Sequence, residues 1–173
     1  MVSDYKEILS DSAKGMKRSA IRELLKLTQK PEIISFAGGL PAKESFPLEQ
    51  LQEICAEVIA TDGAAACQYG STEGVPELLE ILAQRYRDQG LSYVTKENIT
   101  IITSSQQGLD TVGKIFLNRG DKYICELPSY LGAIGAFNSY GGIGVGIPQD
   151  EQGMSAVELE KTLAEMKAKG EKP

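Results

Sequence analysis

The stretch that decides the fold is residues 99–130, ITIITSSQQGLDTVGKIFLNRGDKYICELPSY. Its first four residues are β-branched, and they predict a buried strand. A helix is expected over about 105–117, followed by the turn 118–121 and a second strand over 123–126. The pattern continues downstream with a helix near 131–139, a glycine-rich strand over 141–147 and a helix over 156–169.

Strand and helix therefore alternate three times in the second half of the chain. This alternation predicts an α/β fold, with a mainly parallel sheet flanked by helices. A sheet of three strands would keep a long open edge and incompletely covered faces. We therefore expect an incomplete sheet, and a chain that is one piece of a longer protein.

The first half of the chain is predicted to be helical. Helices are expected over 16–29, 48–60 and 76–89, and glycine- and proline-rich loops separate them. The helix over 48–60 is predicted to bury an apolar stripe: Leu48, Leu51, Ile54, Cys55, Val58 and Ile59.

The composition excludes several classes of protein. A net charge of −6 disfavours binding to nucleic acid or to an anionic membrane. The 173 residues contain no histidine, which removes Ser-His and Cys-His nucleophile pairs and most zinc sites, so no metal site is predicted. No apolar run has the length of a membrane span, and the N-terminus lacks a signal-peptide core, so a cytoplasmic location is expected. The three cysteines are expected to be reduced and to fill space.

Four short motifs are candidates for binding. Ile102–Gln107 joins a strand to a helix N-terminus, where hydroxyls, backbone N–H groups and the helix dipole favour a phosphate. The alternative is that Ser105 is an ordinary N-cap. Pro128–Tyr130 follows the next strand, at the sheet edge where open α/β folds bind ligands, and its tyrosine either stacks on a flat ligand or simply packs. The others are 35–41, SFAGGLP, and 68–74, QYGSTEG, which could instead be a linker and an ordinary turn.

Together these motifs resemble the fold type I pyridoxal-phosphate aminotransferases. The similarity is to the α-aminoadipate, kynurenine and broad-specificity branch, and it extends from about Ser19 to the end of the chain. The matching pieces, in the family's order, are ISFAGGLP with FP, QYGSTEG, ITSSQQGLD and ELPSY with LGAI. The resemblance implies an N-terminal arm over 1–46 and the first part of the large cofactor-binding domain over 47–173.

The resemblance also implies roles for individual residues. Ser105 and Gln106 would hold the cofactor phosphate, and Tyr130 would stack on the pyridine ring. Three further positions are implied to act at the same active site: Tyr69 on the phosphate of the neighbouring subunit's cofactor, Gly39 beside the substrate carboxylate, and Arg22 on a side-chain carboxylate of the substrate. Relatives often have glycine at Ser104, so its serine is a departure that could narrow the phosphate site or add a donor.

The family's Schiff-base lysine, its pyridine-binding aspartate and its carboxylate-binding arginine would all lie beyond residue 173. The resemblance therefore predicts no catalytic residue in this chain and no transaminase activity for it alone. The whole protein would be a homodimer that uses pyridoxal 5′-phosphate to exchange an amino group between an amino acid and a 2-oxo acid. Alternatives on the same scaffold are a lyase or the effector domain of a transcription regulator; Met1 is followed directly by the aminotransferase-type helix, which disfavours the regulator.

Overall fold

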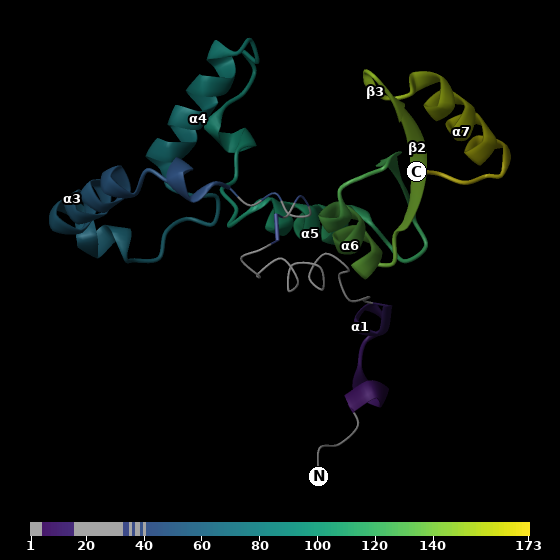
Figure 1. Ribbon diagram of the computed structural model, residues 1–173, viewed down its shortest axis with the longest axis horizontal. Helices are drawn as coiled ribbons and strands as arrows, with labels where there is room; N and C mark the ends of the chain where they lie inside the picture. The colour runs from purple at the N-terminus through teal and green to yellow at the C-terminus, as the bar shows by residue number, and fades with distance from the viewer. Residues whose placement is uncertain (1–4, 16–32, 35, 37–38, 40) are drawn as a thin grey trace. The chain divides into compact units, whose positions relative to one another are not determined.

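The structure is a computed structural model that describes residues 5–15, 33, 34, 36, 39 and 41–173 (Figure 1). Its contacts divide the chain into two units, one of residues 1–18 with 102–173 and one of residues 19–101. Each unit is described by itself. The predicted helix over 16–29, which contains Arg22, lies outside the described residues.

The larger unit is an α/β arrangement built on three strands. Its helices and strands are η1 (Tyr5–Ile8), α1 (Asp11–Gly15), α5 (Ser105–Phe116), β1 (Lys122–Leu127), α6 (Leu131–Ser139), β2 (Ile143–Asp150), β3 (Gly153–Met154) and α7 (Ala156–Ala168). Helices α5 and α6 pack against each other, and α7 packs against β2 (Figure 1). The predicted helices over 105–117, 131–139 and 156–169 are confirmed to within one residue at each end.

The sheet has the order β1-β2-β3 and is of mixed direction. β1 and β2 are parallel, in a register that runs from Lys122 opposite Ile143 to Leu127 opposite Pro148. A short β3 adds an antiparallel pair after the turn that follows β2, which was not predicted. The β1-α6-β2 segment is thus the parallel unit that alternating strands and helices indicate.

Glycines set the starts of both parallel strands. Gly120 and Gly141 have φ of +92° and +80°, values that only glycine adopts readily. The Gly120 N–H donates to the Gly141 carbonyl at 2.9 Å, and the Ile143 N–H donates to the Asp121 carbonyl at 2.8 Å. These two bonds align the strands before the sheet ladder begins.

The smaller unit is helical in its described part. It contains η2 (Lys43–Ser45), α3 (Leu48–Ala66), α4 (Pro76–Asp88) and η3 (Lys96–Asn98). Gly90, with φ of +95°, follows the end of α4. Thr95 and Asn98 form a reciprocal capping box around η3.

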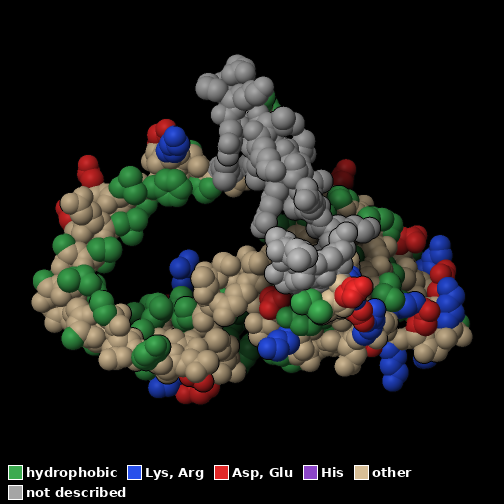
Figure 2. Space-filling view, turned by 90° about the horizontal axis from the view of Figure 1, so that it is seen from below, with side chains coloured by type: hydrophobic (Ala, Val, Ile, Leu, Met, Phe, Trp, Pro, Cys, Tyr) green, Lys and Arg blue, Asp and Glu red, His purple; other side chains and the backbone are tan. Residues whose placement is uncertain are grey.

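Few side chains are buried in the described residues. The buried apolar side chains are Leu79, Ala83, Ala136, Ile147 and Met166. Hydrophobic side chains instead lie at the surface in many places, as the view in Figure 2 shows. The prediction of a buried stripe on the helix over 48–60 was wrong: α3 has no buried residue, because no described element packs closely enough to cover it. Cys55 and Cys67 are likewise exposed, and only Cys125 is partly buried.

The predicted strand over 99–102 was also wrong. These residues are not in a strand, and Ile101 and Ile102 are 38% and 40% exposed. A strand requires a neighbour to bond with, and the sheet in the described residues contains none for this segment. Within its own unit, the Ile101 N–H donates instead to the Glu73 carbonyl, at 2.7 Å.

Candidate functional site

The N-terminus of α5 presents free polar groups. Ser104 is the N-cap, with extended backbone (φ −167°, ψ 170°), and its side chain makes no capping bond. The N–H groups of Gln107 and Gly108 bond to the Ser104 carbonyl, while the N–H groups of the two preceding residues point out of the helix end. The alternative that Ser105 is an ordinary N-cap is therefore not what the structure shows, since Ser105 is the first residue of the helix.

A glutamine side chain orders the junction before α5. The Thr103 N–H donates to Gln107 Oε1 at 2.6 Å. Gly108 lies in the same turn, and a Cβ there would be 2.7 Å from Ile102 Cδ1, so a larger residue would displace Ile102. These contacts fix the path of the chain into the helix, and neither was foreseen from the sequence.

Gln106 connects the start of α5 to the start of α6. Its Nε2 donates to the Gly132 carbonyl at 3.3 Å. Tyr130 is the N-cap of α6, and its ring lies over Gly132: a Cβ at that glycine would be 2.5 Å from Tyr130 Cε1. Gln106 and Tyr130 therefore meet at Gly132. The sequence suggested both residues but not the glycine between them.

The loop before α6 is held from the neighbouring strand. Gln149, in β2, donates from Nε2 to the Pro128 carbonyl at 2.7 Å and to Glu126 Oε2 at 3.1 Å. This pair of bonds positions the turn that carries Tyr130. Sequence reasoning missed Gln149, because its role depends on the register of β1 against β2, which a single sequence does not specify.

The remaining candidate residues belong to the smaller unit or lie outside the described residues. Tyr69 is 99% exposed, and the backbone N–H of Tyr69 bonds to Gln68 Oε1 at 2.8 Å. Gly39 is exposed, with nothing within 4 Å of the position that a Cβ would take. The structure thus brings Gln106, next to Ser104 and Ser105 at the start of α5, to Gly132 beside Tyr130. Tyr69 and Gly39 belong to the smaller unit, and Arg22 lies outside the described residues.

The described residues offer neither a metal centre nor a membrane span. Among them, no group of three or more Cys, Asp or Glu side chains could hold a metal ion. None of the helices in that part of the chain is both long and apolar enough to cross a bilayer.

Comparison with known families decides the classification. The model of the family "Aminotransferase class I and II" matches residues 31–172. The chain belongs to this aminotransferase family. An aromatic-amino-acid aminotransferase of Thermococcus litoralis is 44% identical over 98% of this chain, and a 2-aminoadipate transaminase of Thermus thermophilus is 43% identical over 92%.

The solved structures of aminotransferases agree with the fold. A kynurenine aminotransferase of Pyrococcus horikoshii, determined in complex with PMP, superposes with a TM-score of 0.85 at 40% identity and covers 99% of this chain. This aminotransferase chain has the fold of the first part of a fold type I enzyme, as predicted. It covers 40% and 38% of the two sequence relatives and 42% of the structural one.

Proposed function

We propose that this chain is the N-terminal part of an aminotransferase that uses pyridoxal 5′-phosphate to move an amino group between an amino acid and a 2-oxo acid. The observation that carries the proposal is the meeting of Gln106 and Tyr130 at Gly132, beside the free N-terminus of α5. Family membership and the cofactor derivatives in relatives' structures support it.

The residues present fit the cofactor's phosphate. A phosphate dianion needs several hydrogen-bond donors and favours the positive end of a helix dipole. The start of α5 offers the N–H groups of Ser105 and Gln106, together with the hydroxyls of Ser104 and Ser105. Ser104 would then add a donor where relatives often have none.

The residues present also fit the cofactor's ring. Tyr130 is 65% exposed, so its aromatic face is free to cover a flat ligand. The missing Cβ at Gly132 lets that ring lie close to the start of α6, and Gln149 fixes the preceding loop. When bound, the cofactor supplies the electron-withdrawing system that makes amino transfer possible. This chain's residues bind and orient it.

We further propose roles for Tyr69 and Gly39 of the smaller unit and for Arg22. Tyr69 would contact the cofactor phosphate of a partner subunit in a homodimer of the whole protein, and Gly39 and Arg22 would contact the substrate. In this proposal, residues 1–46 form the arm and residues 47–173 begin the large domain. We place the protein in the cytoplasm, with amino acids and 2-oxo acids as its small-molecule partners and neither nucleic acid nor membrane among them.

An activity assay separates the alternatives. The longer protein is incubated with pyridoxal 5′-phosphate, a panel of amino acids and 2-oxoglutarate, and glutamate formation is followed. We expect glutamate, together with the 2-oxo acid of the donor. A protein that binds the cofactor but yields a lyase product, or that turns over no amino acid, would contradict the proposal.

The 173-residue chain is expected to show no transaminase activity, because the residues that the family uses for covalent chemistry are proposed to lie outside it. Lys43, Lys96, Lys114 and Lys122 are not expected to form a Schiff base. An absorbance band of a Schiff base that survives dialysis of this chain with cofactor would contradict that expectation.

A further inference from the structure

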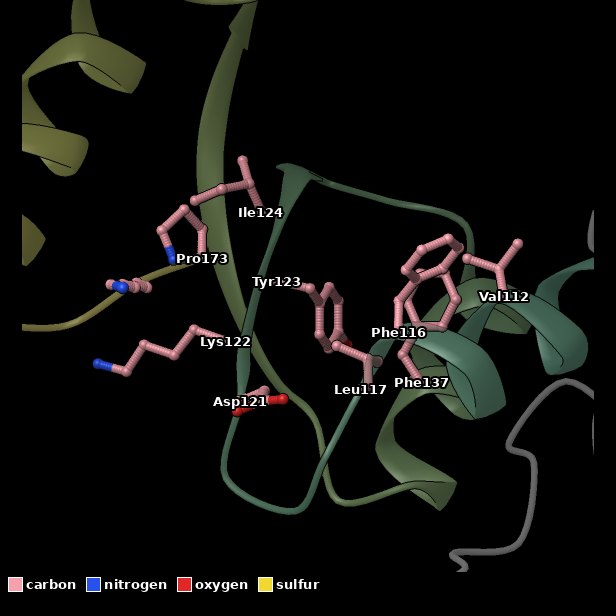
Figure 3. A pocket seen from close by; sticks show the side chains of 10 residues that line it. Val112, Phe116, Leu117, Asp121, Lys122, Tyr123, Ile124, Phe137 and Pro173 are labelled. Atoms are coloured by element: carbon pink, nitrogen blue, oxygen red, sulfur yellow. The ribbon is translucent and has the colours of Figure 1, made fainter.

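A groove of about 700 Å³ lies beside β1. Figure 3 shows the side chains that line it, among them Tyr123 and Phe137, whose rings meet edge to face at 5.0 Å between their centroids. Pro173, the last residue of the sequence, also lines the groove. Because the chain covers 40% of the length of a curated relative, this groove is no evidence for a ligand site.

The turn at residues 71–74, which ends the loop that carries Tyr69, is closed by its own hydrogen bonds. The Gly74 N–H donates to the Ser71 carbonyl at 3.2 Å, and the Ser71 hydroxyl donates to the Gly74 carbonyl. Gly74 has φ of +126°, which favours glycine. These bonds make the turn a compact piece, so a contact at one of its residues holds the whole of it.

Ile101 makes such a contact. Its N–H donates to the Glu73 carbonyl at 2.7 Å. Its side chain lies against Gly74, where a Cβ would be 2.6 Å from Ile101 Cγ1 and 3.5 Å from Cδ2 of the buried Leu79. The turn is therefore held against Ile101 by a hydrogen bond and by close packing that a glycine permits.

Tyr69 takes its position from the backbone on either side of it. Its side chain is 99% exposed. On one side, the Gln68 N–H donates to the Ala65 carbonyl at the end of α3, at 3.1 Å. On the other side lies the turn 71–74, which Ile101 holds. A change in the packing of Gly74 against Ile101 should therefore move Tyr69.

We propose that Ile101 and Gly74 are positioning residues for Tyr69. The inference rests on the role proposed above for Tyr69 at a cofactor phosphate, and it adds the residues that put the tyrosine hydroxyl in place. A phenolic O–H that donates to a phosphate oxygen makes a charge-assisted hydrogen bond, whose strength depends on its geometry. Ile101 and Gly74 touch no ligand in this proposal, and they act through the backbone of the turn.

The next residue of the chain makes a similar contact in the larger unit. Ile102 lies against Gly108 of α5, where a Cβ would be 2.7 Å from Ile102 Cδ1. Consecutive isoleucines thus pack on two different glycines, one that ends the Tyr69 loop and one near the start of α5. Gly108→Ala is therefore a matched control for Gly74→Ala, because it creates a comparable overlap outside the Tyr69 loop.

Titration of the longer protein with two ligands tests the proposal. The ligands are pyridoxal 5′-phosphate and pyridoxal, which has a hydroxyl group in place of the phosphate. Tyr69→Phe should weaken binding of the phosphorylated ligand roughly tenfold or more and leave the affinity for pyridoxal unchanged. Gly74→Ala moves the turn and Ile101 apart by about 1 Å, so it should weaken binding of the phosphorylated ligand severalfold, again without an effect on pyridoxal.

A second variant keeps the test independent of the folding of Gly74→Ala. Ile101→Ala removes the side chain that packs on Gly74, and it should have the same phosphate-specific effect. Thermal unfolding of each variant shows whether it is folded at the temperature of the titration. General loss of structure would weaken the binding of both ligands, whereas a displaced Tyr69 weakens only that of the phosphorylated one.

Combination with Tyr69→Phe tests whether the two residues act through the tyrosine. In the Tyr69→Phe background, Gly74→Ala and Ile101→Ala should cause no further loss of affinity, because the hydroxyl through which they act is absent. Gly108→Ala should change the affinity by the same factor in both backgrounds.

Two results would overturn the inference and leave the role of Tyr69 intact. One is no loss of affinity for pyridoxal 5′-phosphate in Gly74→Ala and Ile101→Ala. The other is a loss by the same factor with and without the Tyr69 hydroxyl. If Tyr69→Phe alone keeps the original affinity, the proposed role of Tyr69 is wrong, and the inference fails with it.

Discussion

Gly132→Ala is the substitution that tests the Tyr130 site most selectively. The new Cβ would lie 2.5 Å from Cε1, 2.6 Å from Cζ and 2.8 Å from the hydroxyl oxygen of Tyr130. Carbon contacts are ordinary from 3.4 Å, so the ring must retreat by about 1 Å. Because Tyr130 is 65% exposed, its ring is free to move outward, and the chain should still fold.

The substitution is therefore expected to separate stability from binding. Alanine within a helix is more stable than glycine by about 0.5–1 kcal/mol, so α6 should be no less stable. Aromatic stacking contributes about 0.5–1.5 kcal/mol beyond area burial, and a ring moved off the cofactor loses much of that. Affinity for pyridoxal 5′-phosphate should fall about three- to tenfold.

The assay pairs two measurements with one control. Stability is measured by thermal unfolding of the 173-residue chain, and cofactor affinity by titration of the longer protein. The control is Gly135→Ala in the same helix, where a new Cβ meets nothing within 4 Å. Gly135→Ala should gain the same helix stability and keep its affinity. If Gly132→Ala binds the cofactor as tightly as Gly135→Ala does, the placement of the Tyr130 ring over Gly132 does not matter for binding.

Three other contacts give measurable effects. Gln149→Leu removes the hydrogen bond to the Pro128 carbonyl and should weaken cofactor binding by the longer protein severalfold. The control Gln152→Leu, in the next turn, should bind the cofactor as the original does. Equal cofactor affinities of the two variants would contradict this. Gly74→Ala should destabilise the chain by about 1–3 kcal/mol, because Gly74 has φ of +126° and a Cβ would be 2.6 Å from Ile101 Cγ1. Urea unfolding measures this loss of stability, and the control Gly70→Ala should show no comparable loss. The hydrogen bond from Lys122 lowers the pKa of Glu171 below its ordinary 4.5. The ion pair should therefore stabilise the chain above pH 4.5, and this stabilisation should disappear as the pH falls through the lowered pKa. A difference in melting temperature between the original chain and Glu171→Gln that does not shrink in acid would refute this.

The local pattern predicted the second half of the chain well. Helices α5, α6 and α7 have apolar spacing and flanking turn residues that are read directly from sequence, and β1 and β2 follow from their apolar runs. The segment 99–102 has the same strand pattern but no strand in the described residues beside it. The prediction of a buried stripe on α3 was wrong for the same reason, because burial requires a second surface that the helix itself does not specify.

Some residues of the candidate site could be proposed from the sequence, and others could not. The residues of the α5 N-terminus and Tyr130 stand out because they follow strands at an edge where ligands bind. Gly132, Gln107 and Gln149 were missed. Their roles come from distances between α5, α6 and β2, and a glutamine or glycine at those positions has no distinguishing signal in one sequence.

A crystal structure of the longer protein with pyridoxal 5′-phosphate is the most direct test of the cofactor site. We expect phosphate oxygens within about 3 Å of the backbone nitrogens of Ser105 and Gln106. The pyridine ring should lie against the Tyr130 side chain. A phosphate bound away from the start of α5, or a ring that Tyr130 does not touch, would contradict the account.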